Sequence, residues 1–336
     1  MVFKKLSHGL SHTIDKAALR LMIAGAQKKW LKHSEYPTPE KIQELERHYL
    51  GQELNKVFSP PAKCHPRQLD QETYSFESHF SPSLKPLVVP YSSYKENYEA
   101  RFKWIKPSGT PRATMYCIHG WQGGHFGLDI KCFRGSKFFE QGFSLCFIEL
   151  PFHGQRESRT KTSPFPSTNI DWTLEAIAQS IHDLRIAKRF IEERSKVPSF
   201  ILGMSLGAYV ASLWATLDSF EFIAALCPAV DLAGLIWNHD QTSLLQRKAS
   251  NHGVTEMDFR KLFSLHSPLA RPLKVPRESR QIVVGSSDAI TPPNQAQALA
   301  AHWECPMTTI TGGHVSFVTQ SKPWELVLKR ALGALS

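Results

Sequence analysis

Ser205 is the residue whose surroundings point most directly to chemistry. It stands between Gly203 and Gly207 in the segment GMSLG, where the apolar run Phe200–Met204 meets a second apolar run, Leu206–Leu217. A serine in the pattern G-x-S-x-G occupies a sharp turn from a strand into a helix, and side chains two residues before and after it would collide. The pattern therefore predicts a serine at a helix N-terminus, where free N–H groups favour a developing oxyanion.

A serine hydroxyl is a weak nucleophile until a base that is oriented by a carboxylate takes its proton. Downstream, VGSSDAITPP places Asp288 just after an apolar strand, and TGGHVSF places His314 just after the final strand. The order serine, aspartate, histidine, each at the end of its own strand, favours Asp288 as the acid and His314 as the base. Asp231, which follows the strand Phe222–Leu226, is the alternative acid. Its competing interpretation is a helix cap or a surface charge.

The chain has 15 histidines that compete for the role of base. Only His314 follows two glycines after a late strand. We expect His119 to shape the loop that follows an earlier strand, and His153 to pack in the loop after Ser144–Leu150. Most of the others, including His266, are expected to be solvated.

Acyl transfer also requires donors for the oxyanion, and two backbone N–H groups are predicted to supply them. One belongs to Leu206, directly after the serine. The other belongs to Trp121 in the loop HGWQGG, whose glycines allow a close approach of the backbone.

Strands and helices alternate along the chain from about residue 70, which predicts a mostly parallel sheet with helices on both faces. Glu72–Phe80 and Tyr98–Lys106 alternate apolar and polar residues, as half-buried antiparallel strands do. The other expected strands are Ala113–Ile118, Ser144–Leu150, Phe200–Met204, Phe222–Leu226, Gln281–Gly285 and Met307–Ile310. The expected helices are Gly135–Gln141, Ile170–Arg194, Leu206–Leu217, Gln295–Trp303 and Lys322–Leu332.

Five segments carry a resemblance to a known superfamily: HGWQGG, PFHGQR, GMSLG, GSSD and GGH occur in that order. From about residue 72 to its C-terminus, the chain resembles the α/β-hydrolase superfamily. The resemblance implies the α/β-hydrolase fold and hydrolysis of a carboxylic ester or thioester through an acyl-enzyme, as a carboxylesterase or lipase-like enzyme does. It implies no metal or organic cofactor. An acyltransferase or peptidase on the same triad, and a non-catalytic binding protein of this fold, remain alternatives.

The domain organisation follows from the same pattern. We expect a hydrolase domain over residues 71–336 and an N-terminal helical extension over residues 1–70. Residues 231–271 stand where the superfamily inserts a short lid. Trp121 and Phe126, near the oxyanion loop, and Trp237, in the lid, are predicted to line the substrate pocket. An apolar lining favours an acyl or aryl ester as substrate, lipid esters included.

The extension contains two predicted helices. Thr38 and Pro39 have the residue types of a helix start, and Ile42, Leu45 and Tyr49 mark a buried face. Residues 11–33 have helical spacing with lysines and one arginine on the polar side. That segment is predicted either to pack on the main domain or to lie on an anionic membrane surface.

Charge and cysteine content limit the remaining function classes. The chain carries 40 Lys and Arg against 30 Asp and Glu, a net charge of +10, but no basic block with interleaved aromatic residues. Nucleic-acid binding is therefore not expected. Six scattered cysteines without metal-ligand spacing indicate a reducing, cytoplasmic environment. Asp15 and Arg20 interrupt the apolar patch near the N-terminus, which predicts an ordinary helix there rather than a secretory signal.

Overall fold

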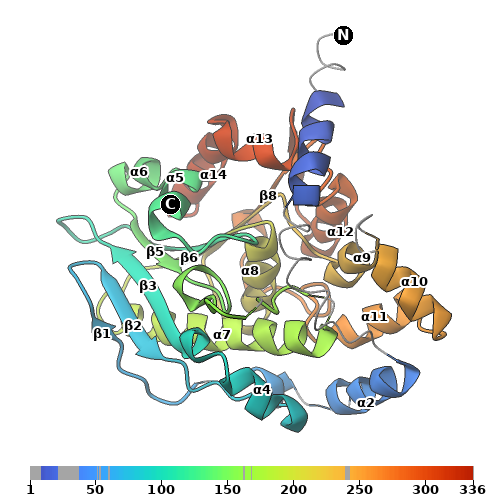
Figure 1. Ribbon diagram of the computed structural model, residues 1–336. Coiled ribbons are helices and arrows are strands. Elements are labelled where there is room, and N and C mark those ends of the chain that lie inside the picture. Colours follow the sequence, from blue (N-terminus) through green and yellow to red (C-terminus); the bar gives the residue numbers. More distant parts are fainter. Residues whose placement is uncertain are drawn as a thin grey trace.

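The computed structural model describes residues 9–21, 38–50, 52, 54–59, 61–161, 163–167, 169–238 and 243–335. Within these residues, one nine-stranded sheet forms the centre of the molecule (Figure 1). The strands are β1 (Arg67–Gln68), β2 (Thr73–Glu77), β3 (Glu99–Ile105), β4 (Thr114–Ile118), β5 (Ser144–Ile148), β6 (Ser199–Met204), β7 (Phe222–Leu226), β8 (Arg280–Gly285) and β9 (Met307–Ile310).

The strand order is β1-β2-β3-β5-β4-β6-β7-β8-β9. Strand β2 pairs antiparallel with both β1 and β3, and β3 pairs antiparallel with β5. All pairs from β5 to β9 are parallel. Strand β3 alternates half-buried and buried residues, whereas β4, β5 and β7 are buried throughout. The predicted antiparallel start and parallel remainder of the sheet are confirmed.

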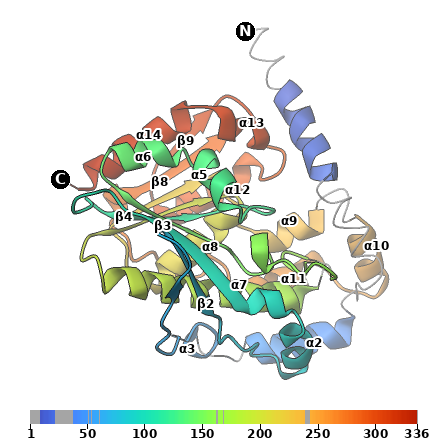
Figure 2. The ribbon, with the colours of Figure 1, turned by 60° about the vertical axis from the view of Figure 1, so that its left-hand side comes forward.

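Helices cover both faces of this sheet (Figure 2). They are α2 (Pro39–Tyr49), α3 (Leu54–Val57), α4 (Val88–Ser92), α5 (Phe126–Cys132), α6 (Gly135–Glu140), α7 (Ile170–Glu192), α8 (Leu206–Leu217), α9 (Leu232–Asn238), α10 (Ser243–Asn251), α11 (Glu256–Phe263), α12 (Pro293–Trp303), α13 (His314–Thr319) and α14 (Lys322–Gly333). Residues 9–21 form a further helix, the N-terminal helix.

Two apolar clusters fill the space between the sheet and its helices, because neighbouring residues of a strand point to opposite faces. In β6, Ile201 belongs to the cluster that includes α7 and α8. Its neighbours Phe200 and Leu202 belong to the other cluster, with Phe138 of α6 and Trp324 of α14. The carboxyl edge of the parallel strands is thus held by packing on both faces.

The N-terminal part of the chain contributes to the same body. Thr38 caps α2 by accepting a hydrogen bond from the Lys41 N–H at 3.3 Å, and Pro39 is the first helical residue, as the sequence predicts. Tyr49, at the end of the buried face of α2, donates a hydrogen bond of 2.9 Å to the buried carboxylate of Glu175 in α7. The helix α2 is therefore packed against the main domain.

The predicted membrane-facing segment 11–33 is described only to residue 21, and residues 22–33 lie outside the described residues. Among the helices that the structure describes, none combines the length and the apolar character needed to cross a membrane. The interval 231–271 contains α9, α10 and α11, with residues 239–242 outside the described residues.

Candidate active site

Ser205 lies in the turn that joins β6 to α8, and its backbone has φ 56° and ψ −120°. A positive φ is uncommon for a residue other than glycine and persists only where the surroundings impose it. The Ser205 N–H donates to the carbonyl of Leu226 at the end of β7, at 2.9 Å, and the Ser205 carbonyl accepts from the Ala229 N–H at 3.3 Å. Bonds to the neighbouring strand end therefore hold the strained residue.

The two flanking glycines are required by contact. A Cβ at Gly207 would overlap the carbonyl oxygen of Ile118 in β4, and a Cβ at Gly203 would overlap the carbonyl oxygen of Gly207 itself. The prediction that side chains would collide at these positions is confirmed. The start of α8 can approach β4 closely only because neither residue has a side chain.

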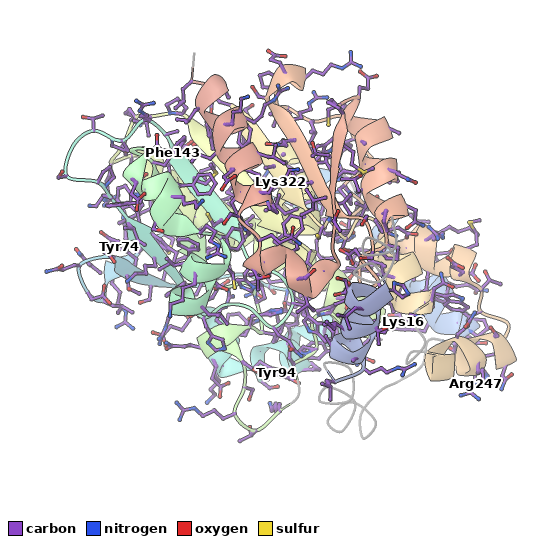
Figure 3. All side chains as sticks on the ribbon, turned by 90° about the horizontal axis from the view of Figure 1, so that it is seen from above. Lys16, Tyr74, Tyr94, Phe143, Arg247 and Lys322 are labelled. Atoms are coloured by element: carbon purple, nitrogen blue, oxygen red, sulfur yellow. The ribbon has the colours of Figure 1, made fainter. Side chains whose placement is uncertain are left out.

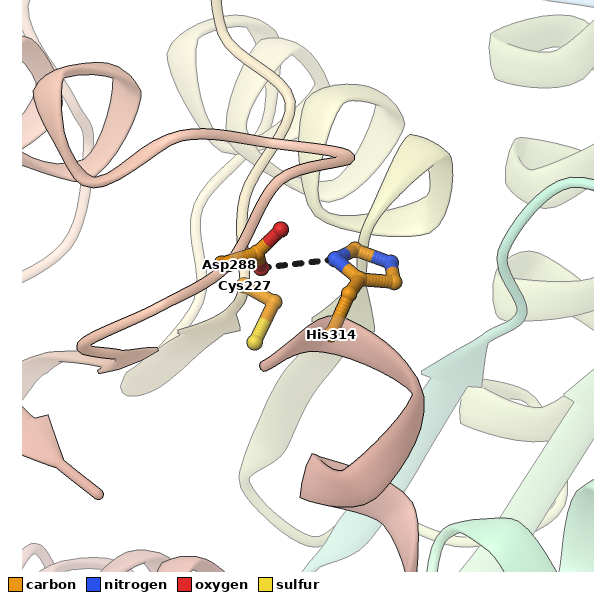
Figure 4. A group of neighbouring side chains, drawn as sticks. All are labelled: Cys227, Asp288 and His314. Atoms are coloured by element: carbon orange, nitrogen blue, oxygen red, sulfur yellow. Dashed lines mark hydrogen bonds and ion pairs between the residues drawn. The ribbon is translucent and has the colours of Figure 1, made fainter. Parts of the chain in front are cut away.

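Asp288 and His314 meet at the carboxyl edge of β8 and β9 (Figure 4). The Nδ1 of His314 lies 2.7 Å from Oδ2 of the buried Asp288 carboxylate. The Thr291 hydroxyl lies 3.1 Å from the same oxygen and 2.9 Å from the Cys227 carbonyl, and its one proton is shared between them. Oδ1 accepts from the N–H groups of Ile290 at 3.0 Å and Thr291 at 2.7 Å. Both oxygens of the carboxylate are therefore held, which fixes its orientation toward the imidazole.

The two loops approach each other because the ladder between β8 and β9 continues beyond the strands. Gly285 pairs with Ile310 at the end of the ladder. The Ser286 N–H then donates to Ile310 at 2.8 Å, and the Ser287 N–H donates to Gly312 at 3.0 Å. These bonds carry both chains to the turn where the acid and the histidine face each other.

The environment of His314 favours its protonated form. Burial alone would lower the pKa of this imidazole, but the charge and hydrogen bond of Asp288, together with the charge of Asp15, raise the pKa above its usual value. Its side chain is 14% exposed. With Nδ1 directed at Asp288, the other ring nitrogen points away from the carboxylate (Figure 4) and can accept a proton.

The structure thus brings Asp288 and His314 into contact and places Ser205 on the same edge of the sheet. Strands β6, β7, β8 and β9 are successive neighbours, and each of the three residues follows one of them. Residue Cys227, after β7, connects the two parts. Its carbonyl accepts a hydrogen bond from the Thr291 hydroxyl at 2.9 Å. The residue before it, Leu226, accepts the hydrogen bond from the Ser205 N–H.

The side chains of Cys227, Asp288 and His314 each offer an atom that could bind a metal ion. These atoms lie within 4.8 Å of one another, close enough to share one ion. Two ligands of one tetrahedral zinc ion lie about 3.4 Å apart. The 2.7 Å between Asp288 and His314 is a hydrogen bond instead. Burial, with the charge of Asp288, also raises the pKa of the Cys227 thiol well above its usual value, so the thiol is neutral in the metal-free protein. These residues fit a proton-transfer pair better than a metal centre.

The loop HGWQGG runs beside the serine. Ile118 of β4 pairs with Gly203 of β6, so both strands end at the same level. A Cβ at Gly120 would lie 3.2 Å from the Cβ of Ser205. Leu206 is the first residue of α8, so its N–H has no acceptor within the helix. Trp121, the second predicted donor, is half-buried in this loop.

Two buried side chains hold that loop. Burial lowers the pKa of His119 to about 3, so the ring is neutral. Its Nε2 accepts from the Leu150 N–H at 3.0 Å, and its Nδ1 donates to the Gly120 carbonyl at 2.8 Å. The Gly124 N–H donates to Asp129 at 3.0 Å, and burial raises the pKa of that carboxyl to about 7. The shaping role expected of His119 is confirmed, whereas no sequence pattern pointed to Asp129.

The predicted substrate-lining residues lie in different surroundings. Phe126 is the half-buried first residue of α5, next to the loop that contains Trp121. Trp237 is buried and packs edge-on against Phe259 at 4.9 Å between centroids. A cavity of about 520 Å³ is lined instead by the N-terminal helix, α9 and residues of the loop between β8 and α12. None of the three aromatic residues lines this cavity.

Asp231, the alternative acid, is engaged elsewhere. Its Oδ1 accepts from the Gly234 N–H at 2.9 Å, which caps α9, and Oδ2 pairs with Arg260. The cap interpretation is confirmed. The expectation that His266 is solvated is wrong, because its ring is buried edge-on against Tyr49 and Phe58 of the N-terminal part of the chain. Burial lowers its pKa to about 3.

Comparisons with known proteins place this geometry in context. No protein-family model matches the chain. It is 30% identical over 264 residues to two proteins of Mycobacterium tuberculosis, uncharacterized protein MT2702 of strain CDC 1551 / Oshkosh and uncharacterized protein Rv2627c of strain ATCC 25618 / H37Rv. The match covers 76% of this chain and 62% of each relative, so the chain spans less than two thirds of the length of these curated relatives.

Solved structures with the same arrangement of elements include acetyl xylan esterase 1 from Thermoanaerobacterium sp. JW/SL YS485. Its TM-score is 0.57 at 14% identity, with 93% of this chain and 98% of that chain covered. TT1662 from Thermus thermophilus has a TM-score of 0.51 at 21% identity, with 71% and 94% covered. Together with the sheet order and the turn at Ser205, these likenesses confirm the α/β-hydrolase fold.

The close approach of α8 and β4 is tested by Gly207→Ala. The added Cβ would overlap a backbone carbonyl that cannot rotate away, so we expect a loss of about 3 kcal/mol in the free energy of unfolding. Gly127→Ala is the matched control, because nothing lies within 4 Å of a Cβ there, and its effect should stay below about 1 kcal/mol. Chemical denaturation measures both, and equal effects would contradict the contact.

Proposed function

We propose that the protein is a serine hydrolase that cleaves a carboxylic ester or thioester through an acyl-enzyme. Ser205 would be the nucleophile, His314 the general base and Asp288 the residue that orients it. The observation that carries this proposal is the 2.7 Å contact between Asp288 and His314 on the sheet edge that also bears the strained Ser205. A hydroxyl, an imidazole and a carboxylate in this order form the serine-hydrolase machinery.

In the proposed first step, Ser205 Oγ attacks the carbonyl carbon while His314 Nε2 takes the hydroxyl proton. The N–H groups of Leu206 and Trp121 would hold the oxyanion. The imidazolium then gives its proton to the leaving oxygen or sulfur, and an acyl-serine remains. Water repeats the sequence in the second half, releasing the acid and restoring the serine.

The environment of His314 supports this role. The imidazolium that forms during attack is stabilised by the Asp288 carboxylate, which accepts hydrogen bonds from Thr291 and two backbone N–H groups and so cannot turn away. The loop expected to supply the second oxyanion donor is held by the neutral His119. A preorganised donor avoids reorganisation at the moment of reaction, which is where such sites gain most of their rate.

For the substrate, we propose an apolar acyl ester, with lipid esters in its range. Trp121, in the proposed oxyanion loop, and Phe126, just after it, would contact the acyl group. The interval 231–271, with helices α9 to α11, would act as a lid. Acetyl xylan esterases are among the proteins of similar fold, which supports ester chemistry without selecting a substrate. An acyltransferase or a peptidase would use the same groups with a different acceptor or leaving group.

An activated serine is tested by intact-mass labelling with a fluorophosphonate. We expect one adduct on the wild type and none on Ser205→Ala, because only a serine with a base beside it attacks phosphorus at a useful rate. Circular dichroism would show that both proteins are folded. A folded wild type that takes no adduct, or a labelled Ser205→Ala, would refute the proposal.

The choice of acid is tested by two matched substitutions. Asp288→Asn keeps the shape but leaves an amide against the imidazole, and kcat should fall by about 10⁴ because the wrong tautomer is favoured. Asp231→Asn keeps the cap of α9, since asparagine also caps helices, and should leave kcat unchanged. The reverse pattern of rates on an aryl ester would assign the acid to Asp231.

The exposed face of the N-terminal helix favours contact with a membrane surface, and we propose that it lies on anionic lipid. Leu10, Ile14 and Leu21 lie on one side of the helix and are 64%, 44% and 75% exposed. Lys16 and Arg20 are exposed on a different side of the helix, where they line the cavity. An exposed apolar stripe on a helix that also carries basic residues is typical of helices that bind at the lipid interface.

This contact is tested by sedimentation with phosphatidylcholine vesicles that contain phosphatidylserine. Ile14→Gln and Leu21→Gln should each weaken binding by about tenfold, because each removes apolar surface from the lipid. Val89→Gln in α4 is the control, since Val89 is 78% exposed on another part of the molecule. If all three variants sediment like the wild type, the N-terminal helix is not the membrane contact.

A further inference from the structure

A carboxylate from the far end of the chain reaches the candidate active site. Asp15 of the N-terminal helix is completely buried. It accepts three backbone hydrogen bonds, from His314 N–H at 2.6 Å, Val315 N–H at 2.9 Å and Ala289 N–H at 3.1 Å. Figures 1 and 3 show the N-terminal helix, marked by Lys16 in Figure 3, beside the C-terminal elements drawn in red.

Two of these donors belong to the base and its neighbour. His314 and Val315 are the first residues of α13, and the N–H groups of a first helical turn have no partner within the helix. The residue before the helix usually supplies a capping side chain, but here it is Gly313. Asp15 supplies the missing cap from 299 residues away. A Cβ at Gly313 would overlap the Asp15 carboxylate, so the glycine leaves room for this contact.

The third donor belongs to the loop that carries the acid. Ala289 directly follows Asp288, whose carboxylate binds the His314 ring. Asp15 therefore joins the backbones of the two loops, while Asp288 and His314 join their side chains. Asp15, Ala289, Asp288 and His314 thus form a closed chain of contacts that includes the proposed proton-transfer pair.

We propose that Asp15 is a positioning residue of the active site, which fixes the His314 loop against the Asp288 loop and so keeps the imidazole aligned with Ser205. The proposal rests on the proposed function. It makes the N-terminal helix part of the catalytic apparatus rather than an appendage to the hydrolase domain. The competing explanation is an anchor that only attaches the helix to the body.

The charges around His314 give this proposal a distinctive readout. Asp288 faces the imidazole from the loop after β8, Cys227 from the end of β7 and Asp15 from the N-terminal helix. Burial lowers the pKa of His314, and the negative charges of Asp288 and Asp15 together raise it above its usual value. When one of these negative charges is removed, the imidazolium is less stable and the pKa of His314 falls. The base then stays neutral to lower pH, and the acidic limb of the activity profile moves down.

Asp15→Asn and Asp15→Ala test the proposal on the full-length chain, with Ala17→Gln, at an exposed position of the same helix, as control. We expect kcat on an aryl ester to fall by about tenfold for Asp15→Asn and about 100-fold for Asp15→Ala, with KM nearly unchanged. The acidic limb should move to lower pH for Asp15→Asn. Ala17→Gln should behave like the wild type. Unchanged kcat and pH profile in folded Asp15 variants would leave only the anchoring role and overturn the proposal.

A second measurement does not depend on turnover. In the Ser205→Ala background, NMR titration of the His314 imidazole should show a lower pKa with Asp15→Asn than without it, and no change with Ala17→Gln. An unchanged His314 pKa would overturn the proposal. A wild type without fluorophosphonate labelling, combined with a shifted His314 pKa, would refute the proposed function while retaining the contact between Asp15 and the histidine loop.

Discussion

The hydrogen bond between Asp288 and His314 is the interaction on which the proposed chemistry depends. It forms because the ladder of β8 and β9 continues into the two loops and brings their turns level. Its strength follows from burial, since a carboxylate out of water interacts strongly with the one cation that can form beside it. Such a carboxylate is stable only when fully hydrogen-bonded, and Thr291 with two backbone N–H groups meets that requirement.

Two buried histidines show how position alone separates structural from chemical roles. His119 has a carbonyl and an N–H as partners, and burial without an anion keeps it neutral, with a pKa of about 3. His314 has Asp288 as partner, and its pKa is raised. His119 can serve only as a fixed brace for the loop HGWQGG. His314 has the carboxylate partner and the raised pKa that suit the proposed general base.

Much of the fold and part of the site could be predicted from local patterns. Apolar runs such as Ala113–Ile118 identify buried strands, and the two glycines around Ser205 identify the sharp turn, because both signals lie within a few residues. Asp15 and Asp129 could not be found in this way. Each lies on a helix whose polar residues look alike in sequence, and only the folded chain shows which carboxylate meets unpaired N–H groups. His266 was misjudged for the same reason, since its burial depends on Tyr49 and Phe58, about 200 residues earlier in the chain.

The bond between Asp15 and the His314 N–H spans 299 residues of sequence, and this span imposes an order on biosynthesis. A ribosome produces the N-terminal helix well before the strand β9 and its loop. Until that loop emerges, the helix has no partner for its one acid, and the sheet lacks its final strand. A nascent or truncated chain can therefore build the serine turn between β6 and α8 without the histidine that would activate it. The proposed nucleophile would remain without its base until the His314 loop has left the ribosome.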